Sequence, residues 1–230
     1  MSFQPTNILI FGATGVIGKP IVDELINEKA SFRRIAIFTS QGAVTSKADV
    51  IRRFEESGVE VFVGDLSDHE YTRHVLEGTR PCSPLPWNQD GKSTSPSPLE
   101  PFDSIISAVG RTAISLQIEL LRLAEAVETV KRFFPSEYGT DIEFDATSAS
   151  EPPHQQKLKV RAFINSFIKR LECTYLVTGP YSDLFLSKMS AAPRMGSFDV
   201  QAKHATLLYQ GEDPISFTSI SEYVLALFPW

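Results

Sequence analysis

The stretch that decides the fold reads Asn7-Ile8-Leu9-Ile10-Phe11-Gly12-Ala13-Thr14-Gly15-Val16-Ile17-Gly18. It begins as a short apolar run, passes through a loop with a glycine at every third position, and continues as a helical pattern to Glu28. Glycine permits a sharp turn out of a strand and a close approach of the following helix to the sheet. The stretch therefore predicts a strand, a tight loop and a helix.

Strand and helix patterns continue to alternate beyond this first unit. Further strands are predicted at residues 34–39, 59–64, 104–110, 132–135 and 174–177, and helices at residues 47–56, 69–76, 114–127 and 153–171. The strand patterns are continuous apolar runs, as strands buried on both faces require. We therefore expect an α/β fold, a Rossmann-type doubly wound parallel sheet with helices on both faces.

One segment breaks this alternation. Residues 79–101 hold six prolines and several serines and show no apolar period. Such a composition predicts a surface insertion between a helix and the next strand. It is either a tolerated insertion or a loop that closes on a ligand or partner.

Composition narrows the class of protein. The chain has 230 residues, 42% of them hydrophobic, and a net charge of -6, without a basic run that would favour nucleic-acid binding. Its two cysteines, Cys82 and Cys173, suggest reduced thiols rather than a metal site. We see no secretory signal and no apolar run of about 20 residues, so we expect a cytoplasmic protein that does not bind membranes.

The glycine loop has the context of a dinucleotide site, because it follows a strand pattern and opens a helix pattern. Gly12 permits the turn, Gly15 lets the main chain approach a pyrophosphate, and Gly18 lets the helix pack on the sheet. Free N–H groups at the helix start favour phosphate. The alternatives are a purely structural turn or a site for another nucleotide.

The end of the second strand bears on the choice of cofactor. NAD sites commonly carry a carboxylate there, but this chain reads Thr39-Ser40-Gln41-Gly42. Without that carboxylate a 2′-phosphate is tolerated, and Lys47 is the nearest cation that can pair with it. Lys47 is equally explained as a solvated lysine at a helix start.

Lys157 is the strongest candidate for chemistry. In the helix pattern of residues 153–171, at about 100° per residue, it falls inside the apolar stripe. The other cations, Lys159, Arg161, Lys169 and Arg170, are predicted to face water. A partly buried lysine has a lowered pKa, which suits proton transfer. It can also extend its charged end to water along the apolar surface. His154, three residues earlier, is either a neighbour in the same site or incidental.

Other catalytic patterns are missing from the sequence. None of the six tyrosines is followed four residues later by lysine, so the Tyr-x-x-x-Lys pair of common short-chain dehydrogenases is absent. Neither a Ser-His-Asp order nor a metal-ligand spacing offers a competing chemistry.

Three segments together resemble a known family: Gly12 to Gly18, the run Val130 to Gly139 with its Phe-Phe-Pro-Ser-Glu-Tyr-Gly sequence, and Lys157 to Arg161. They are similar to the NmrA-like branch of atypical short-chain dehydrogenases, and within it to the isoflavone reductase and phenylcoumaran benzylic ether reductase family. That family usually has phenylalanine where Tyr138 stands.

The resemblance implies NADPH as hydride donor, Lys157 as the catalytic lysine and Lys47 near the 2′-phosphate. Ser40 departs from the arginine that the family often carries, which weakens the expected preference for NADP. The resemblance places these residues at the cofactor: Gly12, Ala13, Thr14, Gly15, Val16, Ile17, Gly18, Ser40, Lys47, Val109, Gly110, Phe134, Pro135, Ser136 and Lys157. It places Gly179, Pro180 and Tyr181 at the substrate, although Pro135 and Pro180 can simply end strands and Tyr181 can be a core residue.

The resemblance also suggests a division of the chain. Residues 1–152 are expected to form the NAD(P)-binding domain, and residues 153–230 the catalytic helix, the last core strand and a partial substrate region. Family members continue beyond the position of Trp230, so we expect a C-terminally shortened relative with an incomplete substrate region. A capping pattern at Ser219 to Glu222 predicts a helix that reaches Phe228.

Three hypotheses of function follow. The first is an NADPH-dependent oxidoreductase that transfers hydride to a small aromatic or conjugated substrate, with Lys157 as general acid or base. The second is a non-catalytic NmrA-like regulator that senses NAD(P) and binds a protein partner. The third is a shortened chain with little activity. We expect a small-molecule substrate and neither nucleic acid nor membrane as partner; a homodimer or a regulatory protein partner is compatible with the sequence.

Overall fold

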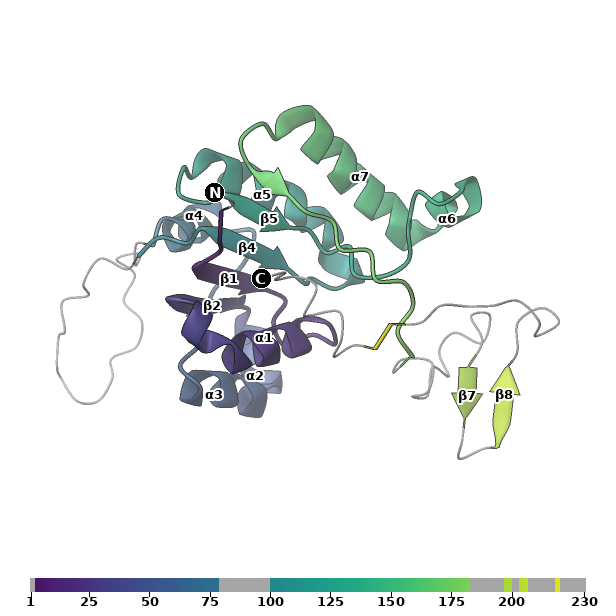
Figure 1. Cartoon of the computed structure of the whole chain (residues 1–230), viewed down its shortest axis with the longest axis horizontal. Coiled ribbons are helices and arrows are strands. Elements are labelled where there is room, and N and C mark those ends of the chain that lie inside the picture. Colours follow the sequence, from purple (N-terminus) through teal and green to yellow (C-terminus); the bar gives the residue numbers. More distant parts are fainter. Residues whose placement is uncertain (1–2, 79–99, 183–196, 200–202, 207–217, 220–230) are drawn as a thin grey trace.

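A parallel sheet of six strands organises the part of the chain that the structure describes. The computed structural model describes residues 3–78, 100–182, 197–199, 203–206 and 218–219. The strands are β1 (Asn7–Phe11), β2 (Arg34–Thr39), β3 (Glu60–Val63), β4 (Ser104–Ser107), β5 (Arg132–Phe134) and β6 (Glu172–Cys173). Their order in the sheet is β3-β2-β1-β4-β5-β6, and all neighbours are parallel (Figure 1). This is the strand order of a Rossmann fold, so the predicted fold class is confirmed.

Helices cover both faces of the sheet. They are α1 (Gly18–Asn27), α2 (Gln41–Ser46), α3 (Ala48–Glu56), α4 (His69–Leu76), α5 (Gln117–Ala126), α6 (Ala146–Ser150) and α7 (Pro152–Phe167), with 3-10 turns η1 (Lys29–Ser31) and η2 (Arg111–Leu116). In Figure 1, α4, α5 and α7 lie above the sheet and α1 and α3 below it. A separate antiparallel pair joins β7 (Ser197–Asp199) and β8 (His204–Thr206).

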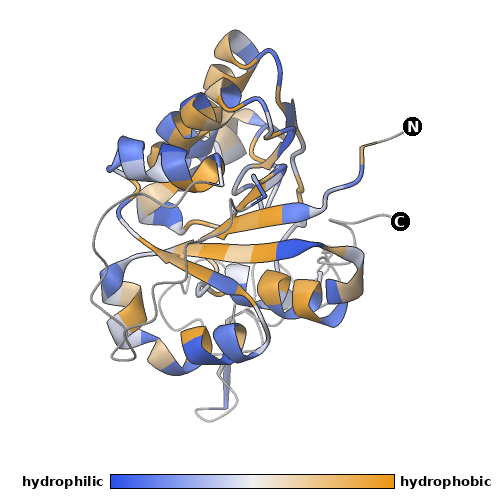
Figure 2. Ribbon diagram, turned by 90° about the vertical axis from the view of Figure 1, so that its left-hand side faces the viewer, coloured by the Kyte–Doolittle hydropathy of each residue, from blue (hydrophilic) through white to orange (hydrophobic). Residues whose placement is uncertain are grey.

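Strand β1 shows why its sequence is apolar throughout. Successive side chains of a strand point to opposite faces. Ile8 and Ile10 therefore pack with the residues of α1 and α3, while Leu9 and Phe11 pack with those of α4, α5 and α7. Each of the four is at most 1% exposed. Figure 2 shows the strands as an apolar layer between helices that are hydrophilic on their outer sides.

The parallel strands bring five loops to one edge of the sheet. The segments that follow β1, β2, β3, β4 and β5 all begin there, because parallel strands end on the same side. The strand order reverses between β1 and β4, and in such sheets ligands bind outside the carboxyl ends of the strands at that point. The fold therefore directs attention to the loops after Phe11 and Ser107.

Several sequence expectations need correction. The predicted helix 114–127 is split into η2 and α5, and α2 was not predicted. The predicted strand 174–177 is wrong, since the sixth strand of the parallel sheet is Glu172–Cys173 and residues 174–177 carry no assigned structure. Helix α7 ends at Phe167, whose side chain is 62% exposed rather than part of a buried stripe.

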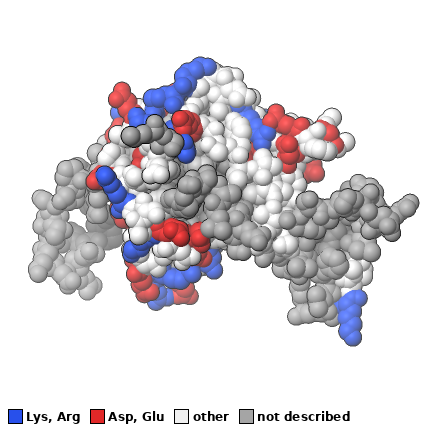
Figure 3. All heavy atoms as spheres, in the orientation of Figure 1, with Lys and Arg blue, Asp and Glu red and all other residues white. Residues whose placement is uncertain are grey.

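Some expectations lie outside the part of the chain that the structure describes. They are most of the insertion at residues 79–101, Cys82, and the helix expected from residue 219 to residue 228. Within the described ranges, none of the helices is long and apolar enough to cross a membrane. On the face drawn in Figure 3, acidic and basic side chains are mixed around the helices.

Candidate active site

The glycine loop is fixed by close main-chain packing. Gly12 has a φ of 78°, a conformation that favours glycine, and a Cβ there would overlap the carbonyl group of Ala108. A Cβ on Gly18 would overlap the carbonyl oxygen of Gly12. The amide of Gly15 donates to that same oxygen at 3.0 Å. The loop therefore has a shape that side chains at these positions would destroy.

A hollow of about 320 Å³ opens beside this loop. Its walls come from the segments that follow β1, β2, β3 and β4 and from η2. The lining residues are Phe11, Gly12, Thr14, Phe38, Thr39, Ser40, Ala43, Gly64, Asp65, Leu66, Val109, Gly110, Ala113 and Leu116. Five of the residues predicted for a cofactor line it: Gly12, Thr14, Ser40, Val109 and Gly110.

Lys47 lies against the glycine loop although 33 positions separate it from Thr14. Its Nζ donates to the carbonyl oxygen of Thr14 at 2.7 Å, and its side chain is exposed. Ser40 has a different task, since its hydroxyl accepts the amide of Ala43 at 3.3 Å and caps α2. Lys47 thus brings a positive charge to the loop, while Ser40 supplies an uncharged wall of the hollow.

Asp65 is a lining residue that the sequence reasoning missed. It follows β3, and its carboxylate accepts the amide of Ser67 at 2.8 Å. That bond, with a second one from the Ser67 side chain, holds the pKa of the carboxyl below its usual value. Asp65 is therefore a fixed anionic acceptor at the β3 side of the hollow. Its position directly after a predicted strand was the signal that could have found it.

On the other side of the switch point, Ser136 joins the loops after β4 and β5. Its hydroxyl donates to the carbonyl oxygen of Val109 at 2.9 Å, and its amide donates to Oε1 of Gln117 at 2.8 Å. Gln117 is 2% exposed and was not singled out from the sequence. Phe134 and Pro135, just before Ser136, are buried. This network fixes the main chain beside the hollow.

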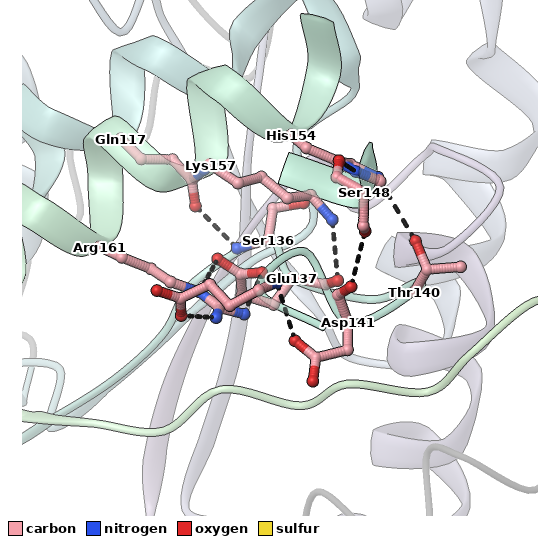
Figure 4. Close-up of polar contacts among 10 residues, drawn as sticks. Gln117, Ser136, Glu137, Thr140, Asp141, Ser148, His154, Lys157 and Arg161 are labelled. Carbon is pink, nitrogen blue, oxygen red and sulfur yellow. Dashed lines mark hydrogen bonds and ion pairs between the residues drawn. The ribbon is translucent and has the colours of Figure 1, made fainter. Parts of the chain in front are cut away.

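The side chain of Lys157 contacts Glu137, the residue that follows Ser136 in this loop. Its Nζ donates to the carbonyl oxygen of Glu137 at 2.8 Å (Figure 4). Burial lowers the pKa of Lys157, the Glu137 carboxylate partly raises it, and the charges of Arg161 and Arg111 lower it further. A lysine with a lowered pKa exchanges its proton more readily near neutral pH. Since Ser136 and Glu137 are neighbours in the chain, one loop connects the hollow to Lys157.

The expectation that Arg161 faces water is wrong. Its side chain is 9% exposed and forms a two-pronged ion pair with Glu137, with Nε–Oε1 at 3.2 Å and Nη2–Oε2 at 2.9 Å. Glu137 itself is 1% exposed. Arg161 also pairs with Glu143 and lies over the ring of Tyr175, 4.9 Å from its centroid. The periodicity of one helix could not reveal a carboxylate 24 residues away.

His154 contacts α6 and the loop that precedes it. Its Nδ1 lies 2.6 Å from the carbonyl oxygen of Ser148, so that nitrogen carries the proton and donates. Its Nε2 lies 3.4 Å from the hydroxyl of Thr140 (Figure 4). These contacts tie α6 and the loop before it to α7, and they give His154 a local structural role.

The segment predicted to contact substrate is tied to the same region. The amides of Thr178 and Gly179 donate to the carbonyl oxygen of Gly139 at 3.1 and 2.8 Å. Tyr181 is 4% exposed and packs in the core with Phe134 and Tyr138. Its burial favours the interpretation of Tyr181 as a core residue. Pro180, between Gly179 and Tyr181, is only half-buried.

The fold and this site define a Rossmann-type domain with a glycine cradle at the switch point. The NmrA-like family model matches residues 4–214, and the chain belongs to the NmrA-like family. It is 28% identical to an isoflavone reductase of Pisum sativum over 80% of this chain and 53% of that protein. It is 26% identical to phenylcoumaran benzylic ether reductase PT1 of Pinus taeda, over 81% of this chain and 53% of that protein. The resemblance stated from the sequence is thus confirmed.

Solved structures show the same fold. A crystal structure of isoflavone reductase matches with a TM-score of 0.71 and 21% identity, covering 98% of this chain and 65% of that one. AtPrR2, solved with NADP+ and (+)pinoresinol, matches with a TM-score of 0.59 and 22% identity, covering 80% of this chain and 53% of that one. The chain spans about half the length of the curated relatives it matches.

Proposed function

We propose that this chain binds NADP(H) in the hollow at the switch point and reduces a small aromatic or conjugated substrate, with Lys157 as proton donor. The glycine cradle supports a dinucleotide, because a Cβ at Gly12 or Gly18 would overlap the main chain that shapes the loop, and that shape lets Gly15 approach a phosphate. NADP+ bound to the related AtPrR2 supports the choice of cofactor. Bound NADPH supplies a hydride.

Different residues around the hollow bind different parts of that cofactor. The start of α1 carries no acidic residue in its first turn, so its free N–H groups can receive a pyrophosphate. Lys47, already at the glycine loop, supplies a cation for the 2′-phosphate. Asp65, on the β3 side of the hollow, accepts a hydrogen bond from an amino group of the cofactor. Val109, Gly110 and Ser136 then adjoin the nicotinamide half.

The observation that carries the proposed chemistry is the position of Lys157. Lys157 is partly buried, and its pKa is lowered mainly by that burial. Its Nζ is hydrogen-bonded to the carbonyl oxygen of Glu137, the residue that follows Ser136. When a conjugated substrate receives a hydride it gains an electron pair and needs one proton. The Lys157 ammonium gives that proton, becomes a neutral amine and regains a proton from water, so charge and atoms balance.

Binding is tested by titrating the purified chain with NADPH and with NADH, following nicotinamide fluorescence and the melting temperature. We expect saturable binding with a lower Kd for NADPH, and an increase in Tm with ligand concentration. If neither NADPH nor NADH binds, the proposed cofactor site is refuted.

Chemistry is tested with Lys157→Met and the matched control Lys159→Met, an exposed lysine on the same helix. NADPH oxidation is followed with (+)pinoresinol and with an isoflavone, the compounds that the relatives' names suggest. Lys157→Met should lose at least about 100-fold in turnover with a nearly unchanged NADPH Kd, and Lys159→Met should behave as wild type. Wild-type turnover in Lys157→Met would remove Lys157 from the mechanism. NADPH binding without any turnover would favour the regulatory hypothesis instead.

A further inference from the structure

Glu137 makes two contacts of different kinds with one helix. Its main-chain carbonyl accepts the Nζ of Lys157, and its carboxylate is paired with the guanidinium of Arg161. Lys157 and Arg161 are four residues apart on α7, so they lie one above the other on the same face. Figure 4 shows both side chains reaching down from α7 to this single loop residue.

We propose that Glu137 is a positioning residue for Lys157: its carbonyl oxygen holds the ammonium group, and its carboxylate, fixed by Arg161, keeps that carbonyl in place and supplies the opposing charge. The inference rests on Lys157 being the proton donor of the proposed function. Glu137 itself takes no part in proton transfer, since its carboxylate is committed to Arg161.

The geometry favours a positioning role over a merely stabilising one. A buried ion pair gives little net stability, because removing two charges from water offsets their attraction. This pair is buried on both sides, with 1% and 9% of the two side chains exposed. Its two prongs fix the orientation of the residue as well as its distance. An apolar pair would fill the same space but would leave the carbonyl of Glu137 free to turn away from Lys157.

The charges around Lys157 act in opposite directions. Glu137, from the loop after β5, favours the protonated amine, while Arg161 on α7 and Arg111 at the start of η2 disfavour it. Arg161 is itself balanced by Glu137 and Glu143. Loss of the Glu137 charge therefore removes the carboxylate that favours protonated Lys157 and leaves the opposing effects of Arg161 and Arg111.

The test measures the protonation of Lys157 directly. Limiting acetic anhydride labels only deprotonated amines, and peptide mass spectrometry reports each lysine separately. Labelling of Lys157 is measured against pH, with exposed Lys159 as the internal reference. In Glu137→Gln we expect the Lys157 midpoint to move to lower pH, and kcat for NADPH oxidation to fall by about 10- to 100-fold. If Glu137 were only a structural support, its loss would let water reach Lys157 and the midpoint of Lys157 would rise. An unchanged or raised midpoint overturns the proposal.

Glu143→Gln is the matched control, because Glu143 shares the guanidinium of Arg161 but is 60% exposed. It should leave the Lys157 midpoint where it is. The double variant Glu137→Gln/Arg161→Met removes both buried charges and guards against a single variant that does not fold. In it the midpoint should return towards the wild-type value, while kcat stays about 10-fold low because the carbonyl is no longer held. Wild-type kcat in the folded double variant would refute the positioning role.

The outcomes separate this inference from the proposed function. If Lys157→Met keeps full turnover while Glu137→Gln shifts the labelling midpoint down, the proposed chemistry fails and the control of Lys157 by Glu137 stands. If Lys157→Met is inactive and the midpoint does not fall in Glu137→Gln, the chemistry stands and the positioning role fails.

Discussion

The side chains of Glu125 and Arg170 bind each other's main chain: Glu125 accepts the amide of Arg170, and Arg170 donates to the carbonyl of Glu125. The Glu125 carboxylate accepts the amides of Lys169, Arg170 and Leu171 at 3.0, 2.8 and 3.1 Å. The Arg170 guanidinium in turn donates to the carbonyls of Ala124, Glu125 and Val127 at 2.7, 2.9 and 2.9 Å. The C-terminal end of α5, whose last carbonyls lack helical partners, is thereby fixed to the connection between α7 and β6.

Glu125→Gln should lower the free energy of unfolding by about 1–2 kcal/mol, because a charged acceptor of three amides becomes a neutral one. Urea unfolding at neutral pH measures the change. Glu119→Gln, on the same helix and in an exposed pair with Arg122, should change stability by less than about 0.5 kcal/mol. Equal effects of the two substitutions would contradict a specific role for Glu125.

The same site predicts a pH dependence. Burial alone would raise the pKa of Glu125, but the three amide bonds and Arg170 outweigh it and lower the pKa. A lowered pKa in the folded state means that the stabilisation is complete above the unfolded value of about 4.3 and is lost as pH falls through the folded value. The stability difference between wild type and Glu125→Gln should therefore shrink below about pH 4.3. A constant difference down to pH 2 would argue against it.

Gly18→Ala tests the cradle. Its Cβ would overlap main-chain atoms of Gly12 and Ala13, which cannot move as a flexible side chain could. We expect a loss of about 1–3 kcal/mol in stability and loss of NADPH binding. Gly42→Ala is the control, since its Cβ would meet only the hydroxyl of Ser40, at 3.9 Å. That helical position should gain up to about 1 kcal/mol. NADPH binding unchanged in Gly18→Ala would contradict the assigned cradle.

The sequence could predict what depends on local pattern. Asn7 to Gly18 specifies a strand, turn and helix through consecutive residues, and repetition of that unit predicts a parallel sheet. Arg161 shows the limit, because its burial depends on Glu137, which lies in a different element. Gln117 likewise falls inside the predicted helix 114–127, and only the fold brings its side-chain amide to the main chain of Ser136. Polar residues buried by distant partners leave no periodic signal.

Arg34→Lys should be destabilising although it keeps the charge. Arg34 holds Glu60 through two bonds, of 2.7 and 2.9 Å, while its guanidinium lies 4.0 Å from the ring centroid of Phe102. A lysine can neither form two parallel hydrogen bonds to the carboxylate nor stack on the ring. We expect a loss of about 1–3 kcal/mol, measured by urea unfolding. Arg52→Lys, in an exposed pair with Asp49, should have almost no effect. Comparable effects at both positions would rule out the special geometry of Arg34.

Lys47→Met tests the choice between the two nicotinamide cofactors. The Nζ of Lys47 lies at the glycine loop, 2.7 Å from the carbonyl oxygen of Thr14, where it is available to a 2′-phosphate that only NADPH carries. Removing one charged hydrogen bond should raise the NADPH Kd about tenfold or more and leave that of NADH within about twofold. Lys29→Met is the matched control, since Lys29 is also exposed and also donates to a carbonyl, that of Ser57 at 3.1 Å, at the far end of α1. Ser40→Arg should tighten NADPH binding by adding a second cation to the wall of the hollow. An equal loss of affinity for both cofactors in Lys47→Met would show that Lys47 supports the loop and does not read the 2′-phosphate.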